Sequence, residues 1–290
     1  MDIQLATAHG VILSEENTLS YSTFEIPTLG NSDVKIDIHS AAINPSDVMF
    51  TKGMYPADKA RPISVGFEGS GTVVEAGSDP AAQALIGKNV CFFSSGKHNP
   101  GSWSEVTVVS SASCVPLPGD LTLEEGATCL VNPLTVQGFL LESESKNYKC
   151  IVHSAAASQL GRMLVNGCKQ HDLKLINVVR RQEQVDILKN LGAEYIINTG
   201  EENWKDQMTA LFAELKPQAF FDAIGGETAS EIIDLMPNNT TTYNYGALSL
   251  RPIKMSSLDL IFKGKVLRGY WLSADISNPE IAGKLFQGAF

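Results

Sequence analysis

The spacing of apolar residues changes near residue 125, and the two parts of the chain predict different architectures. Before that point, short apolar runs lie between turns rich in Gly, Pro and Ser, at 24–26, 34–42, 71–76, 89–93 and 103–109. Few patterns there have the length or period of a helix. Runs of this kind predict short strands joined by turns. We therefore expect an irregular, mostly β domain at 1–125.

From residue 121 onward, helical patterns and buried-strand patterns alternate. The expected strands are 149–154, 173–179, 195–198, 219–223, 240–245 and 266–271, and the expected helices are 121–125, 127–141, 160–168, 186–191, 204–215, 228–235 and 281–287. Strands that alternate with helices form a parallel sheet covered on both faces. The predicted fold class is therefore α/β, with a doubly wound parallel-sheet domain at 126–272 after the mostly β domain.

The stretch 148–181 indicates what the second domain binds. It reads as strand, tight turn, helix and strand, and its turn at 155–161 is built mainly from small residues. Small residues let backbone N–H groups approach a diphosphate, and the N-terminus of the following helix favours negative charge. We expect Ser158, Gln159 and Leu160 to bind the diphosphate of a dinucleotide. Because the glycine pattern is incomplete, a strand–helix–strand unit of some other α/β protein is the alternative.

Arg180 and Arg181 end the second strand of this unit. An acidic side chain at this point binds the ribose hydroxyls of NAD, whereas Arg accommodates the 2′-phosphate of NADP. The pair therefore predicts NADP(H) as the cofactor. The alternative is two solvated arginines before a helix.

Composition excludes several classes of function. The chain has 290 residues and a net charge of −10, from 22 Lys and Arg against 32 Asp and Glu, which favours neither nucleic acid nor an anionic membrane as partner. No apolar run approaches the length of a membrane span. The five cysteines form no CxxC pair and no secretory signal is evident, which predicts a reducing, cytoplasmic location.

Motifs along the chain carry a resemblance to a known family. Residues 66–77, GFEGSGTVVEAG, fit the GxExxGxVxxxG pattern of the medium-chain dehydrogenase/reductases, and AAINPSD at 41–47 resembles the AxxNPxD segment of their zinc-free branches. AAASQLG at 155–161 stands where these families carry AxxGxxG, and DAIGG at 222–226 matches DxxGG. LIFKGKVLRGYWL at 260–272 is similar to the trans-2-enoyl-thioester reductases.

The resemblance implies a GroES-like substrate domain at 1–125 and a Rossmann domain at 126–272, with the nicotinamide in a cleft between them. We expect residues 273–290 to begin a truncated return of the chain to the substrate domain. Relatives are often dimers through the edge of the cofactor sheet, which leaves a homodimer open here.

The same resemblance predicts a site without metal. Zinc-dependent relatives place a Cys near position 44 and a His after Gly66, but this chain has Asn44 and Phe67. Phe cannot bind a metal ion. A zinc-binding label on this chain would therefore describe its fold and not its chemistry.

Two residues are the expected catalytic groups. Tyr55 stands where enoyl-thioester and many quinone reductases carry a Tyr, which in the former resembles a proton donor to the α-carbon; covering a loop is its alternative role. Asn44 corresponds to an Asn near the nicotinamide ribose, and an Asx turn before Pro45 is its alternative. Glu68, a lone carboxylate in the 66–77 motif, is expected to be structural.

Further residues are expected near the cofactor. Thr135 matches a Thr that approaches the nicotinamide, although its hydroxyl could instead bond to its own helix. Gly246 and Ala247 follow the fifth strand of the sheet. Tyr270 and Trp271 would line the nicotinamide end or else belong to the core.

These observations favour a metal-independent, NADPH-dependent reductase of a small molecule, either a quinone or an activated C=C bond in an enone or 2-enoyl thioester. The acidic balance gives no sign of a basic rim for a pantetheine phosphate, which slightly favours a small quinone or enone. An NADP(H)-binding structural or regulatory protein without turnover is the alternative, and a zinc-type alcohol dehydrogenase is a weaker one.

Overall fold

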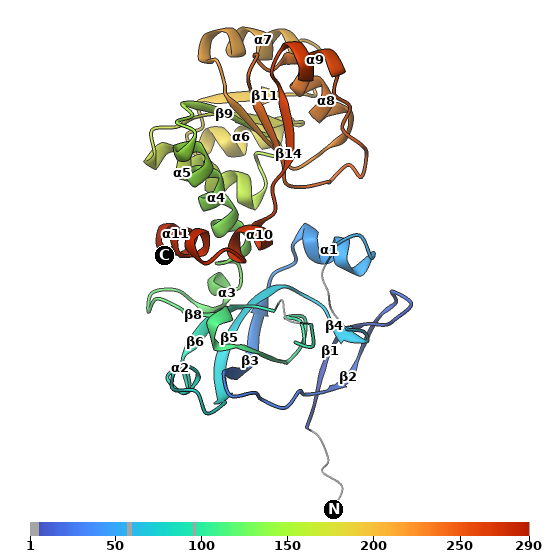
Figure 1. The fold of residues 1–290 in the computed structure, drawn as a ribbon, viewed down its shortest axis with the longest axis vertical. Helices are drawn as coiled ribbons and strands as arrows, with labels where there is room; N and C mark the ends of the chain where they lie inside the picture. The colour runs from blue at the N-terminus through green and yellow to red at the C-terminus, as the bar shows by residue number, and fades with distance from the viewer. Residues whose placement is uncertain (1–5, 57–59, 95–96, 290) are drawn as a thin grey trace, which may run out of the picture. The chain divides into compact units, whose positions relative to one another are not determined.

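The computed structural model describes residues 6–56, 60–94 and 97–289 (Figure 1). The chain divides into two compact units, Met1–Val131 and Asn132–Phe290. The mixed α/β class predicted from the sequence is confirmed, because antiparallel sheets occupy the first unit and a parallel sheet occupies the second.

The first unit contains a three-stranded sheet in the order β2-β1-β4 and a five-stranded antiparallel sheet in the order β7-β3-β5-β6-β8. Along β3, Val34 and Ile36 alternate with more exposed residues, and both pack with Val73, Val90 and Phe92 in one apolar core. The elements of this unit are β1 (Thr7–Leu13), β2 (Leu19–Glu25), β3 (Asp33–Ala41), α1 (Pro45–Thr51), β4 (Ile63–Ser64), β5 (Glu68–Ala76), α2 (Pro80–Gln83), β6 (Asn89–Phe93), β7 (Val106–Ser110), a 3-10 turn (Ser111–Ser113), β8 (Cys114–Pro116) and α3 (Leu123–Gly126).

The second unit is built on a six-stranded parallel sheet in the order β11-β10-β9-β12-β13-β14. Counted from its first strand, this is the 3-2-1-4-5-6 order of a doubly wound dinucleotide-binding fold. Its elements are α4 (Val131–Ser145), β9 (Cys150–His153), α5 (Gln159–Gln170), β10 (Lys174–Val179), α6 (Gln182–Asn190), β11 (Tyr195–Asn198), α7 (Trp204–Leu215), β12 (Ala219–Asp222), α8 (Gly226–Leu235), β13 (Thr241–Asn244), α9 (Ser257–Phe262), β14 (Val266–Gly269), α10 (Leu272–Ile276) and α11 (Pro279–Ala289).

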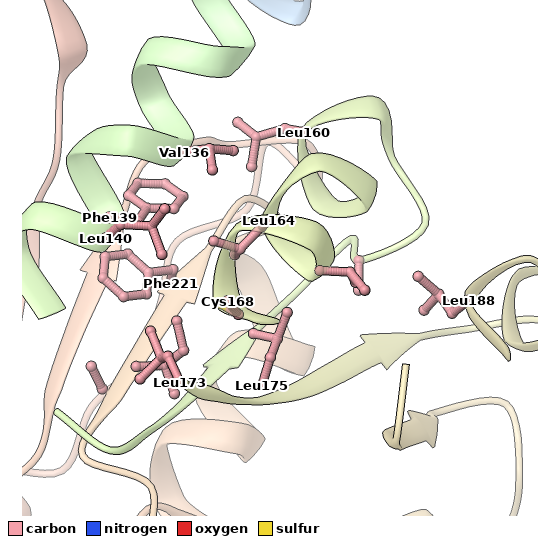
Figure 2. Close-up of a cluster of buried hydrophobic side chains, with 14 of the residues drawn as sticks. Val136, Phe139, Leu140, Leu160, Leu164, Cys168, Leu173, Leu175, Leu188 and Phe221 are labelled. Atoms are coloured by element: carbon pink, nitrogen blue, oxygen red, sulfur yellow. The ribbon is translucent and has the colours of Figure 1, made fainter. Parts of the chain in front are cut away.

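Alternate side chains of the parallel strands enter two cores, one on each face of the sheet. Ile151 of β9 packs with α4, α5 and α6, whereas its neighbours Cys150 and Val152 pack with α7 and α8. Figure 2 shows the first core, where Leu164 and Cys168 of α5 lie beside side chains of α4 and of the strands. Because both faces are covered, the carboxyl ends of the strands are where the sheet can accept a ligand.

Candidate active site

The turn between β9 and α5 is tight and leads directly into a capped helix. Ala155 lies in the left-handed region with a φ of 51°, and the Ser158 N–H donates to the Ala155 carbonyl at 2.9 Å. Ser158 caps α5, since its Oγ accepts from the Gly161 N–H at 3.1 Å. The N–H groups of Gln159 and Leu160 have no acceptor within the helix. The Ser158 hydroxyl proton and these N–H groups form a donor set suited to an anion.

Gly161 lets this helix lie directly against the turn. A Cβ built on Gly161 would lie 2.2 Å from the Ala156 carbonyl oxygen, so only glycine fits. This is the close helix–strand packing that the last glycine of a dinucleotide fingerprint provides. The turn thus fits a dinucleotide diphosphate even though Ser158 replaces the usual middle glycine.

A buried carboxylate joins the ends of three strands beside this turn. Asp222, at the end of β12, accepts through Oδ1 from Ser154 Oγ at 2.6 Å, and through Oδ2 from the Gly225 N–H at 2.7 Å and from Asn244 Nδ2 at 3.0 Å. Sequence reasoning noted Asp222 only as part of the DxxGG motif and missed its partners. The carboxylate fixes the edge of the sheet at the point where the strand order reverses.

Four further candidates follow the ends of neighbouring strands. Gly246 lies after β13, and a Cβ there would lie 2.7 Å from the Ala223 carbonyl oxygen; Ala247 follows it in a turn. Tyr270 follows β14 and packs its ring 5.0 Å from that of Phe139, while Trp271 is 46% exposed. Tyr270 is therefore partly a core residue, and about half of Trp271 lies at the surface.

Arg180 and Arg181 lie at the carboxyl end of β10, as the sequence predicts. The Arg180 backbone N–H donates to Gln184 Oε1 at 3.1 Å, and its side chain is exposed. Arg181 begins α6, and its Nε lies 3.7 Å from the exposed carboxylate of Glu183. Exposed pairs of this kind are weak. Both guanidinium groups can therefore turn towards a phosphate.

In the first unit, a buried carboxylate anchors the residues on either side of α1. Asp47 accepts from the Asn44 N–H at 2.6 Å through Oδ2 and from the Phe67 N–H at 2.9 Å through Oδ1. Asn44 begins α1, and Tyr55 follows it with its ring 5.1 Å from the Phe67 ring. Asp47 and Phe67 thus hold the two predicted catalytic residues of this unit in one local framework.

Glu68 holds the side chain of Asn44. Its Oε1 accepts from Asn44 Nδ2 at 2.8 Å, and its Oε2 accepts from the N–H groups of Leu130 and Val131 at 3.2 and 2.8 Å. Because burial removes water from this carboxyl group, its pKa rises to about 6. Both oxygens are occupied, which fits the expected structural role better than that of a free base.

Thr135 lies buried on α4, within the second unit. The aromatic ring of Phe67, which stands where zinc enzymes carry a His ligand, packs with Phe50 and Tyr55. Among the residues that the structure describes, no three His, Cys, Asp or Glu side chains gather as a metal site requires.

Comparison with known families agrees with this geometry. A profile described as "Alcohol dehydrogenase GroES-like domain" matches residues 30–119, and one described as "Zinc-binding dehydrogenase" matches residues 160–287. A bovine (Bos taurus) mitochondrial enoyl-[acyl-carrier-protein] reductase is 32% identical over 257 residues, which are 86% of this chain and 67% of that protein. The chain belongs to the medium-chain dehydrogenase/reductase superfamily, in its zinc-free quinone and enoyl reductase branch.

Solved structures of this superfamily share the fold. A Mesorhizobium loti protein that carries an NADPH:quinone reductase name is 32% identical, with a TM-score of 0.90 over 100% of this chain and 89% of that one. The mitochondrial 2-enoyl thioester reductase heterodimer from Candida tropicalis is 21% identical, with a TM-score of 0.81 over 98% and 88% of the two chains, a likeness of fold alone.

Within the described ranges, no helix has the length and apolar character to cross a bilayer. The five cysteines are free thiols. The cytoplasmic location expected from the sequence stays a prediction, and the bovine relative's name assigns that protein to the mitochondrion.

Proposed function

We propose that this chain is a metal-independent, NADPH-dependent reductase that transfers hydride to a quinone or to the activated C=C bond of an enone or 2-enoyl thioester. The observation that carries the proposal is the Ser158 turn at the switch point of a 3-2-1-4-5-6 sheet. The names of the bovine and Mesorhizobium relatives, an enoyl reductase and an NADPH:quinone reductase, support the reaction class.

The second unit holds the cofactor. Ser158, Gln159 and Leu160 bind the diphosphate, and Arg180 and Arg181 bind the 2′-phosphate, because their donors lie at the ends of β9 and β10. A further set lines the nicotinamide half, namely Thr135, Gly246, Ala247, Tyr270 and Trp271. NADPH supplies the hydride when it is bound.

The first unit supplies the polar groups that act on the substrate. When hydride adds to the β-carbon of an enone, negative charge develops on the carbonyl oxygen and the α-carbon must gain a proton. Tyr55 donates that proton, and Asn44 positions the ligand by hydrogen bonding. No metal ion is needed, since hydrogen-bond donors stabilise the developing charge.

A binding and turnover experiment tests this function. We expect purified protein to bind NADPH more tightly than NADH, and to oxidise NADPH with at least one member of a panel of quinones, enones and 2-enoyl thioesters. Arg180→Ala with Arg181→Ala should weaken NADPH binding far more than NADH binding. Lys174→Ala with Lys189→Ala removes the same charge from the opposite ends of β10 and α6 and serves as the control. NADPH binding without oxidation across the panel would favour a non-catalytic role.

We also propose that two copies associate through the edge strand β14. All four residues of β14 are exposed. In the adjoining helix α9, Asp259 is buried and accepts from Lys263 Nζ and Lys265 Nζ at 2.8 Å each, while Leu258, Ile261 and Phe262 are 62%, 69% and 75% exposed. An edge strand beside an apolar helix face is a surface that association covers.

A further inference from the structure

The amide of Asn44 is held by a group that has no hydrogen to donate. Asn44 is 6% exposed and Glu68 is 1% exposed, and Nδ2 lies 2.8 Å from Glu68 Oε1. An ionised carboxylate only accepts hydrogen bonds, so the amide must turn its nitrogen towards Glu68. The carbonyl oxygen of Asn44 consequently faces the other way, towards the Asp47 N–H in the capping box of α1, where its second lone pair is left for a further donor.

The other oxygen of Glu68 cannot exchange roles with the first. Oε2 accepts from two backbone N–H groups, of Leu130 and of Val131 at the start of α4. These two N–H groups need Oε2 as their acceptor, since leaving a buried N–H without a hydrogen bond costs free energy. The orientation of Asn44 is thus set by backbone groups on the far side of a single carboxylate.

We propose that Glu68 is a positioning residue, whose carboxylate orients Asn44 so that its carbonyl oxygen accepts a hydrogen bond from a hydroxyl or N–H group of the bound ligand. This rests on the proposed function, in which Asn44 contacts the ligand. Neither the sequence motif nor the fold assigns this role to Glu68.

The arrangement makes the orientation of Asn44 depend on protonation. Asp47 from α1 is the titratable group whose charge acts on Glu68 and opposes its ionisation. Cys91 from β6 and Cys129 from the segment before α4 also lie near, but the pKa of each thiol is raised, mainly by burial and in part by the charge of Glu68, so both are neutral where Glu68 titrates. With burial, the pKa of Glu68 is about 6. A proton added in acid goes to Oε1, because Oε2 faces two donors. The amide must then turn its oxygen towards Glu68.

Glu68→Gln imposes that reversed orientation at every pH. The oxygen of the introduced amide must face the Leu130 and Val131 N–H groups, so its nitrogen faces Asn44. We expect kcat/KM for NADPH-dependent reduction to fall about tenfold, the factor for one lost hydrogen bond. Wild-type activity should also fall below about pH 6 with an ionisation that the variant lacks. Glu75→Gln is the control, because Glu75 is an exposed residue of the same strand that pairs with Lys35.

Exchanging the carboxylate and the amide between positions 44 and 68 separates an effect of side-chain orientation from a general disruption of the site. In Asn44→Asp combined with Glu68→Gln, the introduced amide nitrogen donates to the introduced carboxylate, whose second oxygen remains an acceptor for the ligand. We expect this double variant to recover most of the lost kcat/KM. Asn44→Asp alone sets two carboxylates against each other and should be poor. Thermal unfolding of each variant shows whether a loss reflects folding.

A readout that needs no ligand is the side-chain amide resonance of Asn44, assigned by its absence in Asn44→Asp. It should titrate near pH 6 in wild-type protein and not in Glu68→Gln. The proposal would be overturned if Glu68→Gln were as active as the wild type, or if the double variant folded but did not recover activity. An Asn44 amide resonance that does not titrate near pH 6 in the wild-type protein would overturn it as well. If none of the tested acceptors supports oxidation of NADPH by the wild-type protein, the proposed function fails. The titration of the Asn44 amide and the NADPH affinity of the variants would still decide the role of Glu68.

Discussion

The Nε2 atom of His153 lies 2.7 Å from the Tyr245 hydroxyl, and the two rings are stacked with an interplanar angle of 9°. His153 ends β9 directly before the diphosphate turn, and it is fully buried. Burial lowers its pKa from 6.5 to about 3, because the charged imidazolium would lose its hydration. The folded protein therefore holds this residue neutral over the physiological range.

His153 should make the protein sensitive to acid. Between pH 6.5 and about 3 the unfolded chain binds a proton that the folded chain does not, so stability falls as pH falls through this window. We expect a loss of about 1.4 kcal/mol per pH unit relative to His153→Gln, which cannot titrate. Urea unfolding of both proteins from about pH 7 to about pH 5 measures the difference across the upper part of this window. Parallel pH curves would contradict this prediction, because they would show that His153 binds its proton equally well in the folded and unfolded chains.

Gly161 should be essential for both packing and cofactor affinity. In Gly161→Ala the new methyl group meets the Ala156 carbonyl 2.2 Å away, and this backbone atom cannot move without shifting the diphosphate turn. We expect a loss of at least about 2 kcal/mol of stability, as for other overpacked sites, together with weaker NADPH binding.

Gly283→Ala is the control for this variant. Gly283 also lies within a helix, but no described atom stands within 4 Å of the added methyl group. It should be neutral or slightly stabilising, since alanine favours helix. Calorimetry and cofactor fluorescence titration of both variants provide the test, and an unchanged NADPH affinity in Gly161→Ala would contradict the role of the turn.

The edge of the sheet should control the oligomeric state. Phe262→Lys places a charge on the exposed face of α9, where burial against a second copy would remove its hydration. We expect light scattering to give the mass of a dimer for the wild type and of a monomer for the variant. Ile187→Lys, on the exposed side of α6, should leave the mass unchanged. A monomeric wild-type protein at micromolar concentration would refute the proposed association.

Regular patterns in the sequence predicted most of the second unit. The bounds of β11 and α7 match the expected strand 195–198 and helix 204–215, because β11 is a short apolar run and the buried residues of α7 recur at helical spacing. The alternation of strands and helices predicted a doubly wound parallel sheet but not its strand order, because more than one order is compatible with this alternation. In the first unit, the expected strand 89–93 coincides with β6.

Short and irregular elements were not predicted. Helix α1 has only seven residues, too few for a periodic pattern, although Asn44 followed by Pro45 is a helix-start signal. Strand β1 was missed as well: its burial alternates, but the small residues Ala8 and Gly10 occupy two of its buried positions, so the sequence shows no clear apolar alternation there. Such elements are stabilised by their neighbours more than by their own sequences.

The polar centres of the sites depend on partners distant in the sequence. Ser154 meets Asp222 across 68 residues, and Asn44 meets Glu68 across 24. A periodic pattern places a residue on a face but does not identify the group opposite it. The sequence motifs include these residues, but only the three-dimensional structure shows which of them form hydrogen bonds with each other.

Tyr55 offers the most direct test of the proposed chemistry. Its ring lies beside Phe67, whose N–H is held by Asp47, so replacing the hydroxyl alone should leave the local packing intact. If Tyr55 protonates the α-carbon of the substrate, Tyr55→Phe should lower kcat by about 10²–10⁴, the usual contribution of a general acid, and leave NADPH affinity unchanged. Tyr21→Phe is the control, since Tyr21 is an exposed tyrosine of the same unit. Steady-state kinetics on the best acceptor would decide the matter, and a kcat within about twofold of wild type would assign proton donation to solvent.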